Sequence, residues 1–164
     1  MKKALSFILF LTVSTVWAQS IHETEFYDFI LPSGDTSSPY QSIKEEFSNI
    51  DSFVLSHNKT PKYLIFVMSN KLTNDFDGLN ISNYMDYLND LGAITVTSAK
   101  ETDGFIVIKF IDHKKENISY TAYLSSNNDI LNRFVFFIPR TVGDMYDNEI
   151  RGIIKSIKYK RLQW

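Results

Sequence analysis

Four short apolar runs lie between residues 94 and 138, and each is separated from the next by a polar, turn-forming segment. Asp103-Gly104 falls after the first run and Asn127-Asn128 after the third, and such pairs favour tight turns between antiparallel strands. The pattern therefore predicts a four-stranded antiparallel meander. The four predicted strands are Ile94–Ala99, Phe105–Ile111, Ile118–Leu124 and Ile130–Ile138.

The second and fourth of these strands are apolar on both of their faces. Phe105 and Val107 alternate with Ile106 and Ile108, and the strand from Ile130 repeats this pattern. A strand that is apolar on both faces must be covered on both faces. Further strands are expected at 26–31, 52–56 and 63–68. The six successive apolar residues from 63 to 68 predict burial on both sides of that strand.

Three amphipathic helices are available to provide the cover. Apolar residues recur at helical spacing over 39–49, over 81–91 and over 146–157. Pro39 suits the first turn of the first helix, and acidic residues near the start of the third suit the helix dipole. The expected fold class is therefore α/β of the α+β type, a mainly antiparallel sheet of about six strands covered by helices on both faces.

The first eighteen residues have the features of a secretory signal peptide. Lys2 and Lys3 precede an apolar stretch, and Val16-Trp17-Ala18 places small residues where a signal peptidase cleaves. An uncleaved membrane anchor is the alternative, but the apolar run is shorter than the roughly 20 residues of a spanning helix. We expect cleavage after Ala18, a secreted or periplasmic location, and one globular domain over 19–164 without a transmembrane segment.

Composition limits the chemistry of this chain. There is no cysteine, which excludes disulfides, thiolate metal sites and thiol catalysis. Without the two leader lysines, 15 Lys and Arg residues stand against 19 Asp and Glu residues, so the charge gives no reason to expect nucleic-acid binding.

No sequence motif predicts a catalytic or metal-binding site. His22, His57 and His113 are unpaired along the sequence and are expected to be exposed polar residues. The acidic stretch 74–78 resembles half of a calcium loop, but Thr73 and Tyr84 stand where its end ligands would be. The sequence therefore predicts no catalytic residue, no metal ligand and no cofactor.

One long loop is a candidate for recognition. The segment 71–80 is longer than most connections in a compact domain, and Phe76 is a large apolar residue among polar neighbours. We expect Phe76 to contact a partner, another protein of the cell envelope. The basic residues from Lys155 to Arg161 are a second such candidate, but they also suit the end of a helix.

Three functions remain open at this point. The leading interpretation is a secreted or periplasmic, non-enzymatic binding or accessory protein. The second is a carrier of an apolar small molecule, because the chain has 13 Phe and 9 Tyr residues that could line a pocket between sheet and helix. The third is a hydrolase built from scattered Asp, Glu and Ser residues.

The order of elements resembles the PsbP-like fold family. An opening strand ends in Leu31-Pro32, a helix at 81–91 precedes the meander, and a closing helix contains the sequence from Glu149 to Lys158. The likeness covers about residues 26–158, although no Trp follows Pro32 as it does in the usual pattern. The resemblance implies an α/β sandwich and an accessory or binding role, and it supplies no functional residue.

Overall fold

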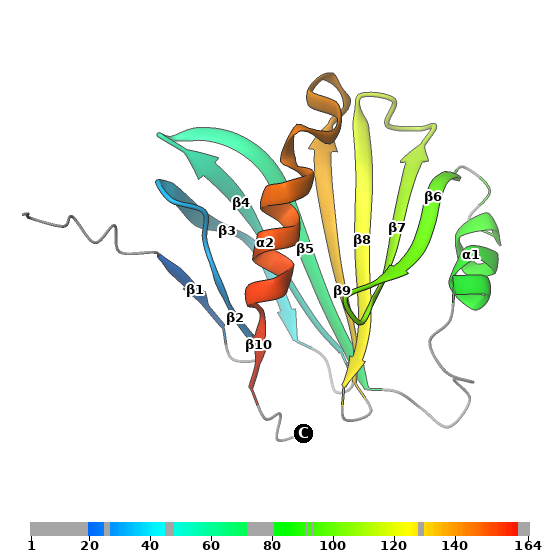
Figure 1. Ribbon diagram of the computed structural model, residues 1–164, viewed down its shortest axis with the longest axis horizontal. Helices are drawn as coiled ribbons and strands as arrows, with labels where there is room; N and C mark the ends of the chain where they lie inside the picture. The colour runs from blue at the N-terminus through cyan, green and yellow to red at the C-terminus, as the bar shows by residue number, and fades with distance from the viewer. Residues whose placement is uncertain are drawn as a thin grey trace, which may run out of the picture.

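The computed structural model describes residues 20–24, 27–44, 48–71, 81–90, 92, 94–127 and 130–160. The predicted signal peptide and Phe76, the candidate partner-binding residue, lie outside these ranges. Two sheets and two α-helices make up the described part of the chain (Figure 1). No helix within these ranges has both the length and the apolar character needed to cross a membrane.

A seven-stranded antiparallel sheet forms the centre of the molecule. Its strands follow the order β3-β4-β5-β9-β8-β7-β6. The bounds are β3 (Asp35–Lys44), β4 (Ser48–His57), β5 (Thr60–Lys71), β6 (Ile94–Thr102), β7 (Phe105–Asp112), β8 (Ile118–Asn127) and β9 (Ile130–Pro139).

The predicted meander is confirmed. Strands β6 to β9 pair in sequence order, each antiparallel to the next. The β6–β7 connection is the predicted Asp103-Gly104 turn, and both residues have positive φ. Side chains alternate between the faces as predicted, so that Phe134 and Phe136 join one hydrophobic cluster and Val135 joins the other.

The predicted helix over 39–49 is wrong. Residues Asp35–Lys44 form strand β3, which pairs with β4 along its length. Pro39 is tolerated because β3 is an edge strand with a register shift between Pro39 and Gln41. Helical spacing over so few residues is weak evidence, and pairing with the neighbouring strand outweighs it.

One face of the seven-stranded sheet is covered over its centre. A three-stranded sheet lies over it, in which β2 (Tyr27–Ile30) pairs with both β1 (Ile21–Glu23) and β10 (Lys158–Tyr159). Beside this sheet runs α2 (Asp147–Ser156), which follows the 3-10 helix η1 (Arg140–Tyr146) (Figure 1). The predicted closing helix is thus confirmed. The core at this face includes Phe29, Phe53, Phe136, Ile150 and Ile154.

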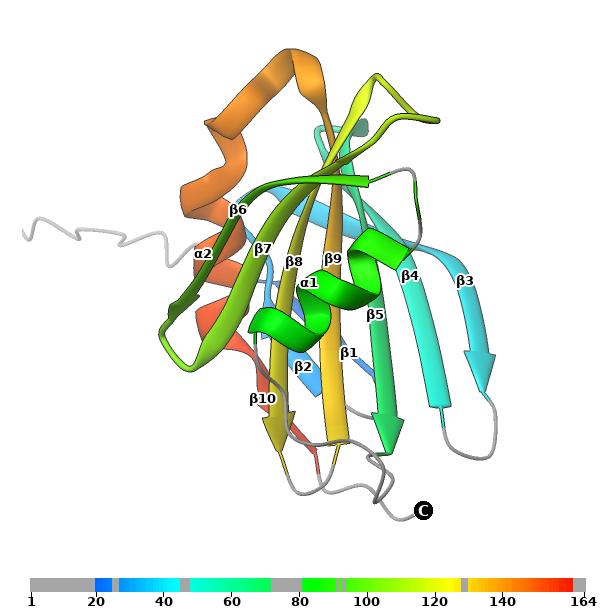
Figure 2. The ribbon, with the colours of Figure 1, turned by 90° about the vertical axis from the view of Figure 1, so that its right-hand side faces the viewer.

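The other face is covered only in part. A single helix, α1 (Ile81–Asp90), crosses it near β6 (Figure 2). Leu88 of α1 is buried against this cluster, but Phe66, Met68 and Phe137 are only partly buried. Strand β5 accordingly alternates between buried and partly buried residues, and the predicted burial of both its faces is not observed.

The expected fold class is therefore correct in its broad description and wrong in its detail. The described residues contain ten strands instead of about six, and two α-helices instead of three. Helices do not cover both faces, because a small sheet provides much of the cover on one face. The chain folds as an α+β protein dominated by antiparallel sheet.

Candidate functional site: an ionic pocket

A pocket lies at the end of the molecule where β3 begins, β4 turns into β5, and η1 leads into α2. Figures 1 and 2 both show the β4–β5 turn and the start of α2 at this end. We call it the ionic pocket, and its volume is about 520 Å³, within the usual range for ligand pockets. Its lining residues are Pro32, Ser33, Asp35, His57, Asn58, Thr60, Pro61, Lys62, Tyr146 and Glu149.

A tight turn places the first acidic residue of the pocket. The backbone N–H of Asp35 donates to the Pro32 carbonyl, and Gly34 within this turn has a φ of +81°. A side chain at Gly34 would bring its Cβ within 3.0 Å of Cε1 of His57. Glycine is therefore needed here both for the backbone conformation and for the close approach of the imidazole.

Strand pairing brings Asp35 and His57 together. The two residues are register partners at the ends of β3 and β4. Nδ1 of His57 lies 2.7 Å from Oδ1 of Asp35. Because the carboxylate, when ionised, can only accept, we assign the proton of this hydrogen bond to Nδ1.

Lys62 joins this pair to the helix α2. Its Nζ donates to Oδ2 of Asp35 at 2.7 Å and to both carboxylate oxygens of Glu149 at 2.5 Å. The hydroxyl of Tyr63 also donates to Glu149, at 2.6 Å. Three strands and a helix thus contribute to a single network of charged and polar groups.

The charged groups differ in how far water can reach them. The Asp35 side chain is 1% exposed and that of Lys62 is 11% exposed, whereas Glu149 is 24% and His57 is 50% exposed. Burial by itself would lower the pKa of Lys62, but hydrogen bonds to Asp35 and Glu149 outweigh it and raise that pKa. Burial, together with the hydrogen bond to Glu149, raises the pKa of the Tyr63 hydroxyl. Lys62 is therefore charged and Tyr63 protonated at neutral pH.

The sequence did not predict this site. His57 was expected to be an exposed polar residue, and it is half-exposed but bonded to a buried carboxylate. His113 is exposed and contacts Thr95, whereas His22 is wrongly predicted, since it is partly buried and stacks on both Phe29 and Phe53. The one available signal was the turn 32–35, in which an acidic residue directly follows a glycine.

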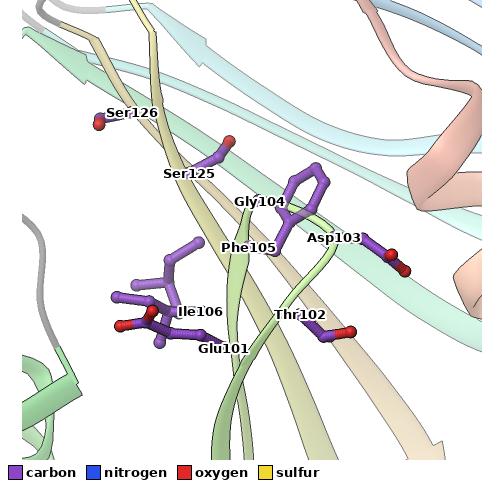
Figure 3. Close-up of a pocket in the computed structure, with 9 residues that line it drawn as sticks. Glu101, Thr102, Asp103, Gly104, Phe105, Ile106, Ser125 and Ser126 are labelled. Carbon is purple, nitrogen blue, oxygen red and sulfur yellow. The ribbon is translucent and has the colours of Figure 1, made fainter.

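A second pocket, of about 460 Å³, lies beside the β6–β7 hairpin and the end of β8. Its acidic side chains do not converge, because Glu101 and Asp103 point in different directions (Figure 3). Asp103 instead forms an ion pair with Lys155 at 3.1 Å. We therefore regard the ionic pocket as the stronger candidate site.

The charged groups of the ionic pocket bond to one another. Among the described residues no group of three or more His, Cys, Asp or Glu side chains is placed to hold a metal ion. Among the described residues, His22 contacts the hydroxyl group of Ser37 and His113 contacts that of Thr95, whereas His57 contacts no hydroxyl group. Asp35, Lys62 and Glu149 bond to one another, which fixes the shape and charge of the pocket.

Comparison with known proteins supports the fold. The structure is similar to the solution structure of cyanobacterial PsbP (CyanoP) from Synechocystis sp. PCC 6803, with a TM-score of 0.58 and 13% sequence identity. The match covers 90% of this chain and 96% of that one. The PsbP-like resemblance of the sequence is thus confirmed as a likeness of fold, and at this identity it shows the fold alone.

A weaker match is a crystal structure from Bacteroides thetaiotaomicron VPI-5482, with a TM-score of 0.49 and 10% identity. The match covers 82% of this chain but 45% of that one, so this chain spans less than half of that protein. No protein-family model matches the sequence. No curated protein is significantly similar to it.

Proposed function

We propose that this protein is an exported, non-enzymatic accessory protein that binds another protein of the cell envelope through the ionic pocket. The observation that carries the proposal is the pocket itself. Its buried carboxylate, Asp35, is held by Lys62 and His57, and the half-exposed imidazole stands at the surface. A rigid charged depression at one end of a domain is suited to hold one polar side chain of a partner.

Two further features support a binding role. The charged groups come from β3, β5 and α2, which are fixed by the core, so a bound group would meet a pre-organised site. The predicted signal peptide supports export. The fold, shared with a PsbP protein, is compatible with an accessory role, but the pocket residues carry the argument.

The two other functions receive less support. A carrier needs its aromatic side chains around a cavity, but here Phe29, Phe53, Phe134 and Phe136 are packed into the core beneath the small sheet.

A hydrolase triad would need a hydroxyl group bonded to the second ring nitrogen of His57. No hydrogen bond of that kind occurs among the described residues, although Ser33 lines the same pocket.

Site-specific photo-crosslinking in intact cells tests this proposal. A photoreactive phenylalanine analogue at Asn58, on the pocket rim, should crosslink to a distinct envelope protein. The matched control places the same group at Lys114, on the exposed β7–β8 turn. The crosslinked protein should begin at Gln19. Equal crosslinking from both positions, or none from Asn58, would contradict docking at the pocket.

A further inference from the structure

We infer that the ionic pocket recognises a cationic side chain of the partner, arginine foremost. This inference rests on the proposed function and adds the chemical class of the bound group. Its first support is charge. With a neutral imidazole, the pocket lining holds two carboxylates, Asp35 and Glu149, and one cation, Lys62. One negative charge is left uncompensated within the lining.

The positive charge of the pocket is shielded from a ligand. Both carboxylates bond to Nζ of Lys62, and the rings of Tyr63 and Tyr146 lie 5.6 and 5.1 Å from it. Glu149 is more than twice as exposed as Lys62. An approaching group therefore meets a carboxylate before it meets the ammonium group, and the field at the mouth favours cations.

His57 adds a hydrogen-bond acceptor at the mouth. Since Nδ1 carries the proton that is donated to Asp35, Nε2 of the neutral ring has a free lone pair. A guanidinium group has five N–H donors in a planar fork, so it can donate to Glu149 and to His57 together. The pocket volume of about 520 Å³ leaves room for an arginine side chain, and Pro32 and Pro61 provide apolar surface for its stem.

An anionic ligand fits this geometry less well. It would need a cation with free donors, but Nζ of Lys62 is already bonded to both carboxylates. Protonated His57 would be the remaining cation among the lining side chains. When the imidazole is neutral, the pocket should therefore bind a cationic group and should not bind an anionic one.

NMR titration of the purified mature protein tests the inference directly. At about pH 8, where histidine is ordinarily neutral, N-acetyl-arginine amide should shift the ring signals of His57 in a saturable manner. The ring of His113, on an exposed turn, is the internal reference. N-acetyl-citrulline amide has nearly the same shape without the charge, and it should bind roughly tenfold more weakly, the difference expected for charge-assisted hydrogen bonds.

A variant identifies the carboxylate involved. Glu149→Gln should lower the affinity for the arginine probe about tenfold, by the same loss of charge assistance. Asp144→Asn is the matched control, because Asp144 is an exposed carboxylate bonded to Lys109 outside the pocket. If Glu149→Gln does not fold, the comparison of arginine with citrulline on the unaltered protein still decides the question.

Three results would overturn the inference. They are equal binding of the arginine and citrulline probes, tighter binding of N-acetyl-aspartate amide, and equal shifts at His57 and His113. If any of these occurs while the crosslink from Asn58 persists, the pocket is a docking site for a different chemical class. If the crosslink is absent, the proposed docking fails whatever the arginine probe does.

Discussion

The two faces of the seven-stranded sheet are covered in different ways. One face lies beneath α2 and the three-stranded sheet, and the large apolar side chains at its centre, such as Phe53, Ile65 and Phe136, are fully buried. The other face has α1 over one part, and Phe66 and Phe137 remain partly exposed. The stability of this domain should therefore depend mainly on the first face.

The face beneath α2 and the small sheet also carries the candidate site at its edge. The ring of Tyr63 packs against Phe136 in the core, while its hydroxyl donates to Glu149 in the pocket. Lys62, its neighbour on β5, points into the ionic network. The packing that stabilises this face thus also fixes the positions of the pocket residues. The partly covered face makes no such contact with the pocket among the described residues.

The largest expected effect comes from placing a charge beneath α2. Ile154→Asp puts an unpaired carboxylate between α2 and the sheet, where Ile150 and Ile153 are also buried. Burial of each isoleucine contributes roughly 1.5 to 3 kcal/mol, and a domain has only about 5 to 15 kcal/mol in total. We expect thermal melts to show an unfolded or severely destabilised protein.

Leu88→Asp is the matched change on the other face. Leu88 is equally buried, but α1 makes few contacts outside β6 and can detach locally at a smaller cost. We expect this variant to keep a cooperative melt at a lower temperature. Similar losses in the two variants would show that the faces contribute equally, and coincident melts of Ile154→Asp and the parent would show that α2 is not docked as described.

Adjacent residues on β9 provide a finer comparison. Phe136 is fully buried on the covered face, whereas Phe137 points to the other face and is partly buried. Phe136→Ala should cost about 3 to 5 kcal/mol in urea unfolding, the usual range for a fully buried phenylalanine. Phe137→Ala should cost less than half as much, because part of its surface is already in water. A larger cost at Phe137 would show that the partly covered face contributes more to stability than the face beneath α2.

How much of this could be predicted from the sequence depends on how local each signal is. The meander was predictable because Asp103-Gly104 and the alternating apolar residues lie within each hairpin. The closing helix was predictable because Ile150, Ile153 and Ile154 recur at helical spacing. Strand β3 was not, because Thr36 to Ser38 have no apolar alternation and its pairing with β4 is a tertiary effect.

Apart from the turn at 32–35, where Asp35 directly follows Gly34, the ionic pocket had no local signal in the sequence. Lys62 meets Asp35 across 27 positions of sequence and Glu149 across 87 positions. No spacing of residue types brings such groups together until the sheet and α2 are placed. The sequence analysis therefore assigned no site to Asp35, Lys62 or Glu149, and it missed the network that joins them.

The smallest expected effect is a dependence of stability on pH, and it arises where β1 of the small sheet contacts the seven-stranded sheet. His22 of β1 stacks on Phe29 and Phe53 at 4.8 and 4.1 Å, and its Nδ1 lies 2.8 Å from the Ser37 hydroxyl. Burial lowers the pKa of His22, and the nearby carboxylates of Asp51 and Asp28 offset this only in part. The folded protein therefore binds this proton less readily than the unfolded chain does.

Linkage gives the direction of the resulting pH dependence. Above pH 6.5, the ordinary histidine value, both states are neutral at His22 and its contribution to stability is fully present. As the pH falls below 6.5, the unfolded chain gains the proton more readily than the folded protein, so stability decreases. Melting temperatures measured from about pH 7.5 to 5.5 stay above the range where carboxylates titrate. His22→Gln should flatten this slope and His113→Gln, on the exposed turn, should not. Equal flattening in both variants would show that burial of His22 between the sheets is not the cause.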